Sequence, residues 1–284
     1  MRAVGLCLAL AGITIAQPGL AACPGPDEIR RYVEDWQAKR PAKALPVADM
    51  KDAACAQGEV VEAMGPTLGK VVGYKAGLTS KATQERFGTN GPVAGVLLQG
   101  MILDSGASVP AAFGARPVWE GDMLLVVKDE GINEAKTLEE ALRHISAMRP
   151  FIELPDLALA PSEKLDGIQL TAINVAARVG VAGPEVPLEP GPETVQRLAD
   201  VRIIVTDATG AKLAEGAGSA TLGNPLGAVV WLVEELGKHG QKLSAGDLIS
   251  VGSFTPLTPP KPGQEVTATY EGLPGTPKVS VKFH

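Results

Sequence analysis

The sequence predicts an α+β fold in which a mainly antiparallel β-domain follows an N-terminal helical part. The 284 residues include 33 glycines and 23 prolines but only 4% aromatic residues, a mixture that favours many turns and short strands. Apolar residues recur at helical spacing before residue 64, whereas short apolar runs between turn residues dominate the last third. We therefore expect a leader over residues 1–22, a helical segment over 23–64 and a main domain over 65–284.

The first 22 residues have the pattern of an export signal. Arg2 supplies the positive charge, and the apolar run from Val4 to Ala16 is too short to span a bilayer. Small residues follow, so cleavage near residue 21 or 22 would release a mature chain that starts around Cys23. The letters L-A-A-C that end at Cys23 also match a bacterial lipoprotein box. We expect a periplasmic protein, with a lipoprotein anchored at Cys23 as the alternative.

The cysteines fit an oxidising compartment. Cys7 would leave with the signal, and Cys23 and Cys55 would remain as an even pair. We predict that they form a disulfide between the mature N-terminus and the main domain. Lipidation of Cys23 would prevent that bond.

Four helices are predicted from periodicity and end signals. The first begins at Pro26, where apolar residues recur opposite charged ones, and a second covers Asp52 to Met64. The third covers Thr137 to Met148, because Thr137 and Glu140 form a capping box and Pro150 follows. The fourth starts at Asn224-Pro225 and is apolar over most of its surface, so it should be buried.

The strands are predicted from short apolar runs. Between Gly65 and Gly77 the pattern becomes short and apolar and ends in V-V-G-Y-K-A-G-L-T, which predicts a strand and a turn, and another strand starts at Glu120. The C-terminal third supplies the rest, and Asp207 to Gly210 reads as a hairpin loop between the first two of them. These C-terminal candidates are 201–206, 212–216, 248–253, 265–270 and 278–283.

Three acidic residues lie in apolar segments. Glu120 and Asp122 occur in V-W-E-G-D-M-L-L-V-V, and Glu153 occurs in P-F-I-E-L-P. On a strand, residues two apart project to the same face, so both carboxylates of the first pair would point one way. Buried carboxylates repel one another, and a divalent cation such as Mg²⁺ or Mn²⁺ would relieve that repulsion. The alternative is a solvated strand edge.

Other chemistries have little support. The net charge of −6 argues against nucleic acid as a partner. The chain has only three histidines, at positions 144, 239 and 284, and none neighbours a nucleophile, so a Ser-His or Cys-His triad and a zinc site are not expected.

Several motifs resemble the 2-keto-4-pentenoate hydratase branch of the fumarylacetoacetate hydrolase family. They are G-Y-K-A-G-L-T-S-K from Gly73, the following Q-E-R-F-G, E-G-D with the downstream I-E-L, G-A-G-S-A-T-L-G-N-P-L-G-A-V-V-W-L from Gly216, and G-D-L-I-S-V-G-S from Gly246. The resemblance spans Glu62 to the C-terminus. It implies a mixed, mostly antiparallel β-roll with flanking helices, and a catalytic domain over 65–284.

The resemblance also implies a site. Its three metal ligands fall on Glu120, Asp122 and Glu153, where Asp122 stands in place of the usual glutamate. Lys75 matches the lysine of the motif and would orient the substrate or transfer a proton. Ser253 falls where a small hydroxyl lies near the substrate, or it satisfies its own backbone. Asn174 would bind a substrate oxygen, or it is a turn residue.

The chain departs from the family at four polar positions. Val93, Val118, Ile173 and Asn224 stand where Asp, Arg, Asp and His are usual, although Arg116 lies two residues before Val118. We expect a more apolar pocket, and either a substrate other than a dienoate or a loss of catalysis.

The resulting expectation is a metal-dependent hydratase-like lyase that adds water to a small unsaturated 2-oxo acid outside the cytoplasm. Its alternative is a catalytically silent, exported 2-oxo acid binding protein. A C–C hydrolase acting on an acylpyruvate ranks lower, because that reaction usually needs a histidine to activate water. The resemblance also implies a homo-oligomer, and no transmembrane span is expected.

Overall fold

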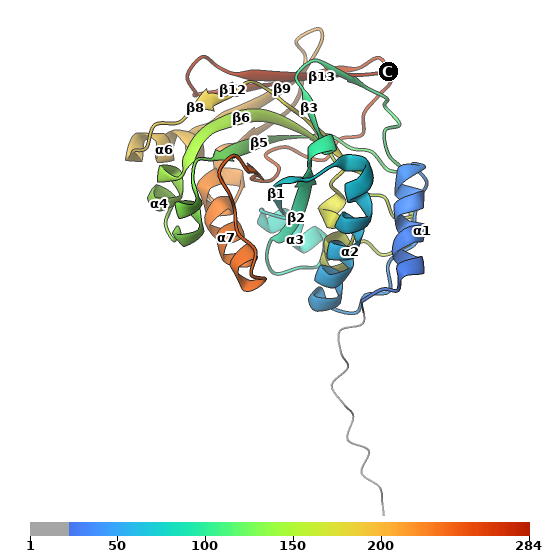
Figure 1. The fold of residues 1–284 in the computed structure, drawn as a ribbon. Helices are drawn as coiled ribbons and strands as arrows, with labels where there is room; N and C mark the ends of the chain where they lie inside the picture. Colours follow the sequence, from blue (N-terminus) through green and yellow to red (C-terminus); the bar gives the residue numbers. More distant parts are fainter. Residues whose placement is uncertain (1–22) are drawn as a thin grey trace, which may run out of the picture.

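The computed structural model describes residues 23–284, and the predicted export signal lies outside this range. Within these described residues, thirteen strands form two sheets, with helices at their flanks (Figure 1). The strands are β1 (Val71–Gly77), β2 (Val93–Leu98), β3 (Ile102–Asp104), β4 (Ala107–Val109), β5 (Glu120–Val127), β6 (Ile145–Leu154), β7 (Val179–Ala182), β8 (Val186–Pro187), β9 (Arg202–Asp207), β10 (Lys212–Ala217), β11 (Leu248–Ser250), β12 (Glu265–Glu271) and β13 (Lys278–Phe283). The helices are α1 (Pro26–Gln37), α2 (Met50–Leu68), α3 (Lys81–Arg86), α4 (Leu138–Arg143), α5 (Gly167–Ala172), α6 (Pro192–Asp200) and α7 (Pro225–Lys238).

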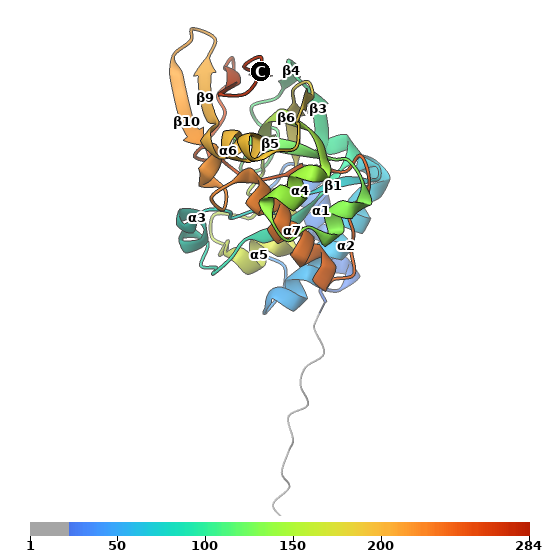
Figure 2. The same ribbon diagram turned by 90° about the vertical axis from the view of Figure 1, so that its left-hand side faces the viewer.

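The larger sheet has the strand order β2-β1-β11-β5-β6-β7-β3, and β8 pairs with β6 beside this path. The smaller sheet has the order β10-β9-β12-β13-β4. Three neighbouring pairs are parallel, namely β1 with β11, β3 with β7 and β4 with β13, and the others are antiparallel. The predicted α+β class and the mostly antiparallel mixed sheets are therefore confirmed, and the β9–β10 hairpin projects at one end (Figure 2).

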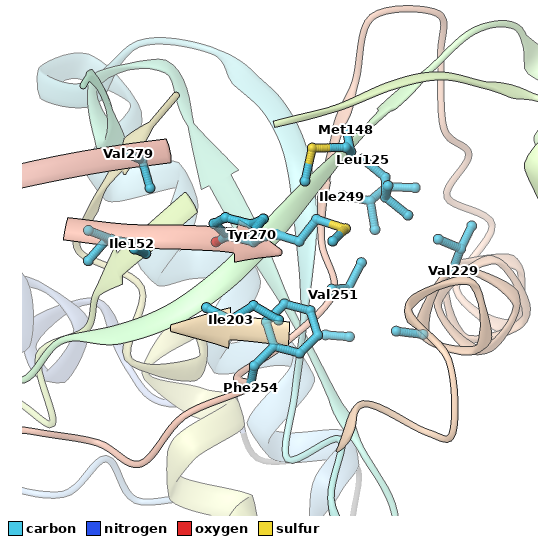
Figure 3. Close-up of a cluster of buried hydrophobic side chains, with 14 of the residues drawn as sticks. Leu125, Met148, Ile152, Ile203, Val229, Ile249, Val251, Phe254, Tyr270 and Val279 are labelled. Carbon is cyan, nitrogen blue, oxygen red and sulfur yellow. The ribbon is translucent and has the colours of Figure 1, made fainter. Parts of the chain in front are cut away.

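The main core lies where the two sheets and α7 meet (Figure 3). Leu125 and Met148 of the larger sheet, Ile203 and Tyr270 of the smaller sheet, and Val229 of α7 are buried in one cluster. Helix α7 is buried along much of its length, as its sequence predicted. Burial of apolar surface on this scale is the dominant favourable term in folding, so this core fixes how the two sheets sit against each other.

The N-terminal helices pack on a second hydrophobic cluster. Helices α1 and α2 lie side by side at one end of the molecule (Figure 1) and share buried contacts with residues near β2 and α5. Arg178 connects α1 to the residues beside the larger sheet. Its guanidinium lies 4.2 Å from the centre of the Trp36 ring of α1. It also donates to the Trp36 carbonyl at 3.0 Å and to the Asp156 carboxylate at 3.1 Å. Stacking combined with hydrogen bonding at a buried arginine holds this helix in one orientation.

Cys23 and Cys55 form a disulfide with a Cα–Cα distance of 5.5 Å, as predicted. We expect the double Ser variant at these positions to lose roughly 2–4 kcal/mol of unfolding free energy, because the bond closes a sizeable loop in the unfolded chain. Urea unfolding in the absence of reductant measures the loss. A reductant should lower the stability of the wild type and leave the double variant unchanged, and equal stabilities without reductant would contradict the prediction.

Two of the four predicted helices differ in extent from those in the structure. Helix α2 extends beyond the predicted 52–64 at both ends. The predicted helix 137–148 is wrong in its second half: the capping box of Thr137 and Glu140 does start α4, but the helix ends at Arg143 and Ile145 begins β6. The apolar residues after His144 suit either element, and pairing with β5 along the whole of β6 decides for the strand. Pro150, predicted to end the helix, lies inside β6 opposite Met123.

None of the helices within residues 23–284 combines the length and the apolar character that crossing a bilayer requires.

Candidate functional site

The three predicted carboxylates share one face of the larger sheet. Glu120 and Asp122 are two apart on β5, and Glu153 on β6 is the direct partner of Glu120 in the antiparallel register. Directly opposed residues of an antiparallel pair project to the same side, as do residues two apart on a strand. All three side chains are buried, and Asp122 has no exposed surface. The alternative of a solvated strand edge does not describe these residues.

Lys75 joins this group from β1. In the register it pairs with Ser250 of β11, and Ser250 pairs with Leu124 of β5, so Lys75 and the β5 carboxylates face the same side of the sheet. Its ammonium contacts the Glu153 carboxylate and donates a hydrogen bond to the Val175 carbonyl at 3.0 Å. The Lys75 side chain is 4% exposed and that of Glu153 is 5% exposed, so the two form a buried ion pair. It neutralises one of the three carboxylates.

The group opens onto a cavity of about 530 Å³. Lys75, Glu120 and Glu153 line one part of it, together with Ser253, whereas Asp122 does not reach its surface. Much of the remaining lining is apolar and comes from the segments around α3, α5 and the loop after β11. A concave apolar pocket with a few convergent polar groups is the usual form of a small-molecule site.

Burial makes the negative charges costly. Burial raises the pKa of Glu120 well above its usual range, and the Glu153 carboxylate raises it further. Burial, and then the Glu153 charge, raises the pKa of Asp122 to about 7, against the opposing hydrogen bonds from Ser250 and from the Met123 backbone. Ionised oxygens that the protein leaves short of positive charge favour a bound cation.

The raised pKa of Asp122 predicts a pH-dependent stability for the metal-free protein. A carboxyl with an ordinary pKa of 3.8 and a folded-state pKa of about 7 binds its proton more tightly when folded. Its contribution to stability is therefore complete below the unfolded pKa and is lost as the pH rises through about 7. Unfolding of chelator-treated protein between about pH 5 and pH 8 should show a loss on the order of a few kcal/mol that Asp122→Asn lacks. Equal pH slopes for the two proteins would contradict the assignment.

Hydrogen bonds from two other strands and from its own strand hold Asp122 in place. The Ser250 hydroxyl donates to one oxygen of its carboxylate, and the Met123 backbone N–H donates to the other at 2.6 Å. Tyr270 belongs to the smaller sheet and contacts the larger one. Its hydroxyl donates to the Asp122 carbonyl of β5 and accepts from the Phe151 N–H of β6 at 3.0 Å. Tyr270 is fully buried and lies among core side chains (Figure 3). These contacts fix the backbone of β5 and β6 at the level of the carboxylates.

Ser253 lines the cavity, and its hydroxyl donates to the Thr255 carbonyl. The same hydroxyl is close enough to Glu120 to lower the pKa of that carboxyl slightly. Thr255 in turn accepts from the Gly121 N–H at 2.8 Å, so this loop is tied to β5 directly. Ser253 therefore has contacts that suit both of its predicted roles. Its hydroxyl donates to a nearby backbone carbonyl, and it lies at the cavity, where a ligand would contact it.

Asn174 is not brought to the cavity. Its amide nitrogen donates to the Val96 carbonyl at 2.9 Å, and its amide oxygen accepts from the Val96 N–H at 2.7 Å, so both ends of the side chain are occupied by β2. Residues 174–176 form a left-handed turn, with φ values of 57°, 52° and 55°. A β-branched residue such as Val175 rarely adopts this conformation, and the Asn174 contacts hold it there. The structure thus describes Asn174 as a turn residue, one of its two predicted roles, and the turn that it anchors offers the Val175 carbonyl to Lys75.

The four departures from the family pattern are also explained locally. Val93, Val118 and Ile173 are all buried. Asn224 caps α7, since its side-chain oxygen accepts from the Leu226 N–H at 2.9 Å. Arg116 does not line the cavity and donates to the Leu159 carbonyl at 3.3 Å.

The donor set has the oxygen chemistry that Mg²⁺ and Mn²⁺ prefer. In the part of the chain that the structure describes, no three His, Cys, Asp or Glu side chains converge at ligand distances. Lys75 contacts Glu153, and Ser250 holds Asp122, so the side chains are engaged with protein partners. The chemistry of the three carboxylates fits a hard divalent ion, and Lys75 would compete with that ion for Glu153.

The chain resembles known enzymes over most of its length. No protein-family model matches it. A 2-keto-4-pentenoate hydratase of Paraburkholderia xenovorans (strain LB400) is 30% identical over 206 residues, which cover 72% of this chain and 74% of that protein. A 4-oxalocrotonate decarboxylase of Pseudomonas putida is 26% identical over 232 residues, 80% of this chain and 84% of that protein.

The solved structures agree with these relatives. The 4-oxalocrotonate decarboxylase from Pseudomonas putida G7, complexed with magnesium and adipate, superposes with a TM-score of 0.81 at 25% identity over 91% of this chain and 96% of that one. The fumarylpyruvate hydrolase from Pseudomonas aeruginosa, in complex with Mn²⁺ and pyruvate, covers 75% of this chain and 89% of its own with a TM-score of 0.55 at 14% identity, and so shares the fold.

The fold and the relatives together define the class. This chain belongs to the 2-keto-4-pentenoate hydratase branch of the fumarylacetoacetate hydrolase family, as its motifs predicted. Within that branch it is similar both to hydratases and to 4-oxalocrotonate decarboxylases.

Proposed function

We propose that this protein is a metal-dependent hydratase-like lyase that adds water to a small unsaturated 2-oxo acid of the 2-hydroxypenta-2,4-dienoate type. The observation that carries the proposal is the placement of Lys75 and the Glu120, Asp122 and Glu153 carboxylates on one sheet face at the edge of a cavity. The hydratase relatives support the reaction, and the magnesium, calcium and Mn²⁺ complexes of the structural neighbours support a divalent metal cofactor.

Glu120, Asp122 and Glu153 would hold Mg²⁺ or Mn²⁺ in this site. When bound, the ion would act as a Lewis acid and a template for the substrate's carboxylate and 2-oxo groups. Asp122 is one methylene shorter than the usual glutamate and does not reach the cavity surface, so it would contact the ion through water.

Lys75 is the residue that we assign to substrate orientation or proton transfer. Its ammonium lies at the cavity between Glu153 and the Val175 carbonyl, within reach of a substrate oxygen. The Ser253 hydroxyl lies at the same cavity and would donate to a second substrate oxygen in place of the Thr255 carbonyl. The apolar lining limits the water around these groups, which strengthens their electrostatic interactions with the substrate.

Turnover tests the proposal. The expected result is loss of the ultraviolet absorbance of 2-hydroxypenta-2,4-dienoate in the presence of Mg²⁺ or Mn²⁺, and no loss after treatment with a chelator. If the protein binds 2-oxo acids with metal but turns over neither the dienoate nor its analogues, it is a silent binding protein of the same fold. No histidine of residues 23–284 lines the cavity, so the structure offers no support for the acylpyruvate hydrolase alternative.

We also propose that the protein acts in the periplasm. The Cys23–Cys55 disulfide supports an oxidising compartment, and it occupies the thiol that a lipid anchor would need. The mass of the non-reduced mature protein tests this: a chain that starts near Cys23 and is two hydrogens lighter than the reduced form is expected, whereas a lipid adduct would contradict it. A homo-oligomer, at least a dimer, stays a prediction that light scattering would test.

A further inference from the structure

The wall of the cavity beyond its polar residues is a hydrophobic cluster separate from the main core. All its members are buried, between 2% and 9% exposed, and all except Val93 line the cavity. They are Leu78, Phe87, Val93, Leu170, Val175 and Ala176. Because these side chains are already packed against one another, the apolar wall is preformed.

Val93 belongs to the cluster and packs behind the residues that line the cavity. It occupies the position where the family motif has an acidic residue. A Cβ atom on Gly77 would lie 2.5 Å from Val175 Cγ1 and 3.4 Å from Val93 Cγ2, so the two valines pack over the Gly77 backbone. A carboxylate at this position would be buried among hydrocarbon, which is costly without a partner.

Val175 links the apolar wall to the polar residues. Its carbonyl accepts from Lys75 at 3.0 Å, while its side chain lines the cavity. The left-handed turn that Asn174 anchors makes this double contact possible. In a ligand that reaches Lys75, the part of the chain next to the reactive groups therefore contacts the apolar wall at Val175.

The size and the charges of the cavity also favour a ligand with an apolar extension. Its volume of about 530 Å³ is within the range of pockets for drug-sized ligands and is far larger than a five-carbon acid needs. Two exposed charges of opposite sign, Arg86 and Glu215, also line it. The Arg86 guanidinium lies 5.6 Å from the centre of the Phe87 ring, and Glu215 pairs with Lys212 at 2.7 Å. Within the described residues, Arg86 is the cation of the lining besides Lys75, and it is exposed, so water and salt screen its charge, whereas the buried wall itself carries no charge.

We propose that the substrates of this protein carry an apolar substituent at the end distant from the 2-oxo acid group, and that Leu78, Phe87, Leu170 and Val175 select it over a terminal carboxylate. This inference rests on the proposed function, because it takes the 2-oxo acid group to lie at Lys75 and the carboxylates.

Calorimetry with Mn²⁺ and three unreactive 2-oxo acids tests the inference. Pyruvate supplies the head group alone, 2-oxohexanoate adds an apolar chain, and 2-oxoadipate has the same chain length with a terminal carboxylate. We expect 2-oxohexanoate to bind more tightly than pyruvate by about fourfold per buried methylene. We expect 2-oxoadipate to bind more weakly than 2-oxohexanoate.

The outcomes separate the inference from the proposed function. If none of the three acids binds with Mn²⁺, the proposed function fails. If pyruvate binds and 2-oxohexanoate binds no better, the apolar selection is wrong while the function stands. Tighter binding of 2-oxoadipate than of 2-oxohexanoate would also overturn the inference, and would assign Arg86 to a second carboxylate.

A matched pair of variants locates the selection. Leu170 is 4% exposed and lines the cavity. Leu165 packs against the same hydrophobic cluster but does not line the cavity. Leu170→Asn should bring the ratio of 2-oxohexanoate to pyruvate affinity close to one, and Leu165→Asn should leave the ratio unchanged. An unchanged ratio in a folded Leu170→Asn would overturn its role. If that variant does not fold, the wild-type comparison of the three acids still decides the inference.

Discussion

Replacement of Glu120 by glutamine is expected to weaken Mn²⁺ binding by at least about 100-fold, because outer groups that only support a ligand already account for 10- to 100-fold. Glutamine keeps the size of the side chain and removes its charge. Glu120 lines the cavity and stands directly opposite Glu153, so the variant loses one of the two predicted metal ligands that reach the cavity surface. Turnover of the dienoate should fall with metal occupancy. Calorimetry with Mn²⁺ measures the affinity, and activity is measured at several metal concentrations.

The metal-free Glu120→Gln protein should be at least as stable as the wild type. Burial and the Glu153 charge raise the pKa of Glu120, so the ionised carboxylate is unfavourable in the fold without a metal.

Glu215→Gln is the matched control for metal binding, since Glu215 also lines the cavity but is exposed. Wild-type Mn²⁺ affinity in Glu120→Gln, or an equal loss in Glu215→Gln, would show that the metal site is placed wrongly.

Replacement of Lys75 by methionine is expected to reduce kcat by about 10²- to 10⁴-fold, the usual range for loss of an acid or base group. Mn²⁺ affinity should be retained or should increase, because the ammonium no longer competes for Glu153. The metal-free variant should be destabilised by roughly 3–5 kcal/mol, since Glu153 is left as an unpaired buried charge. Added Mn²⁺ should restore most of that stability.

Three measurements separate these effects: kcat at saturating Mn²⁺, Mn²⁺ affinity by calorimetry, and the unfolding free energy with and without metal. Lys81→Met is the control, because Lys81 is exposed at the start of α3 and does not line the cavity. Wild-type kcat in Lys75→Met would remove Lys75 from the mechanism. Loss of Mn²⁺ binding together with activity would mean that Lys75 shapes the metal site and has no separate role in the reaction.

The sequence predicted much of the fold because its local signals agree with the tertiary structure. Asn224-Pro225 predicted the start of α7, and the turn residues from Asp207 predicted the β9–β10 hairpin. It failed at Ile145, where an apolar pattern suits a helix or a strand and only the pairing with β5 decides. Elements such as α3 and α5, with six residues each, were not predicted, because segments of this length hold too little periodic signal.

The candidate site divides in the same way. The two-residue spacing of Glu120 and Asp122 determines by itself that both carboxylates face one side, because alternation along a strand is a local property of the backbone. The motif resemblance identified Lys75, Glu153 and Ser253, and the structure places all three at the cavity. It also assigned Asn174 to the substrate, and the contacts with Val96 show a different use. Tyr270 lies outside the quoted motifs, and Ser250 lies inside one of them without being singled out, because the contacts of both residues join strands distant in the sequence.

By itself, then, the sequence determined the family, the α+β class, the likeness of its motifs to those of metal-binding hydratases, and the cysteine pair. Only the tertiary structure decided which groups meet. The pairing of Glu120 with Glu153 depends on the register of β5 and β6, and the approach of Lys75 depends on β11 lying between β1 and β5. These are contacts between residues far apart in the chain, and their geometry follows from how two sheets and their helices bury a common core, which no local pattern encodes.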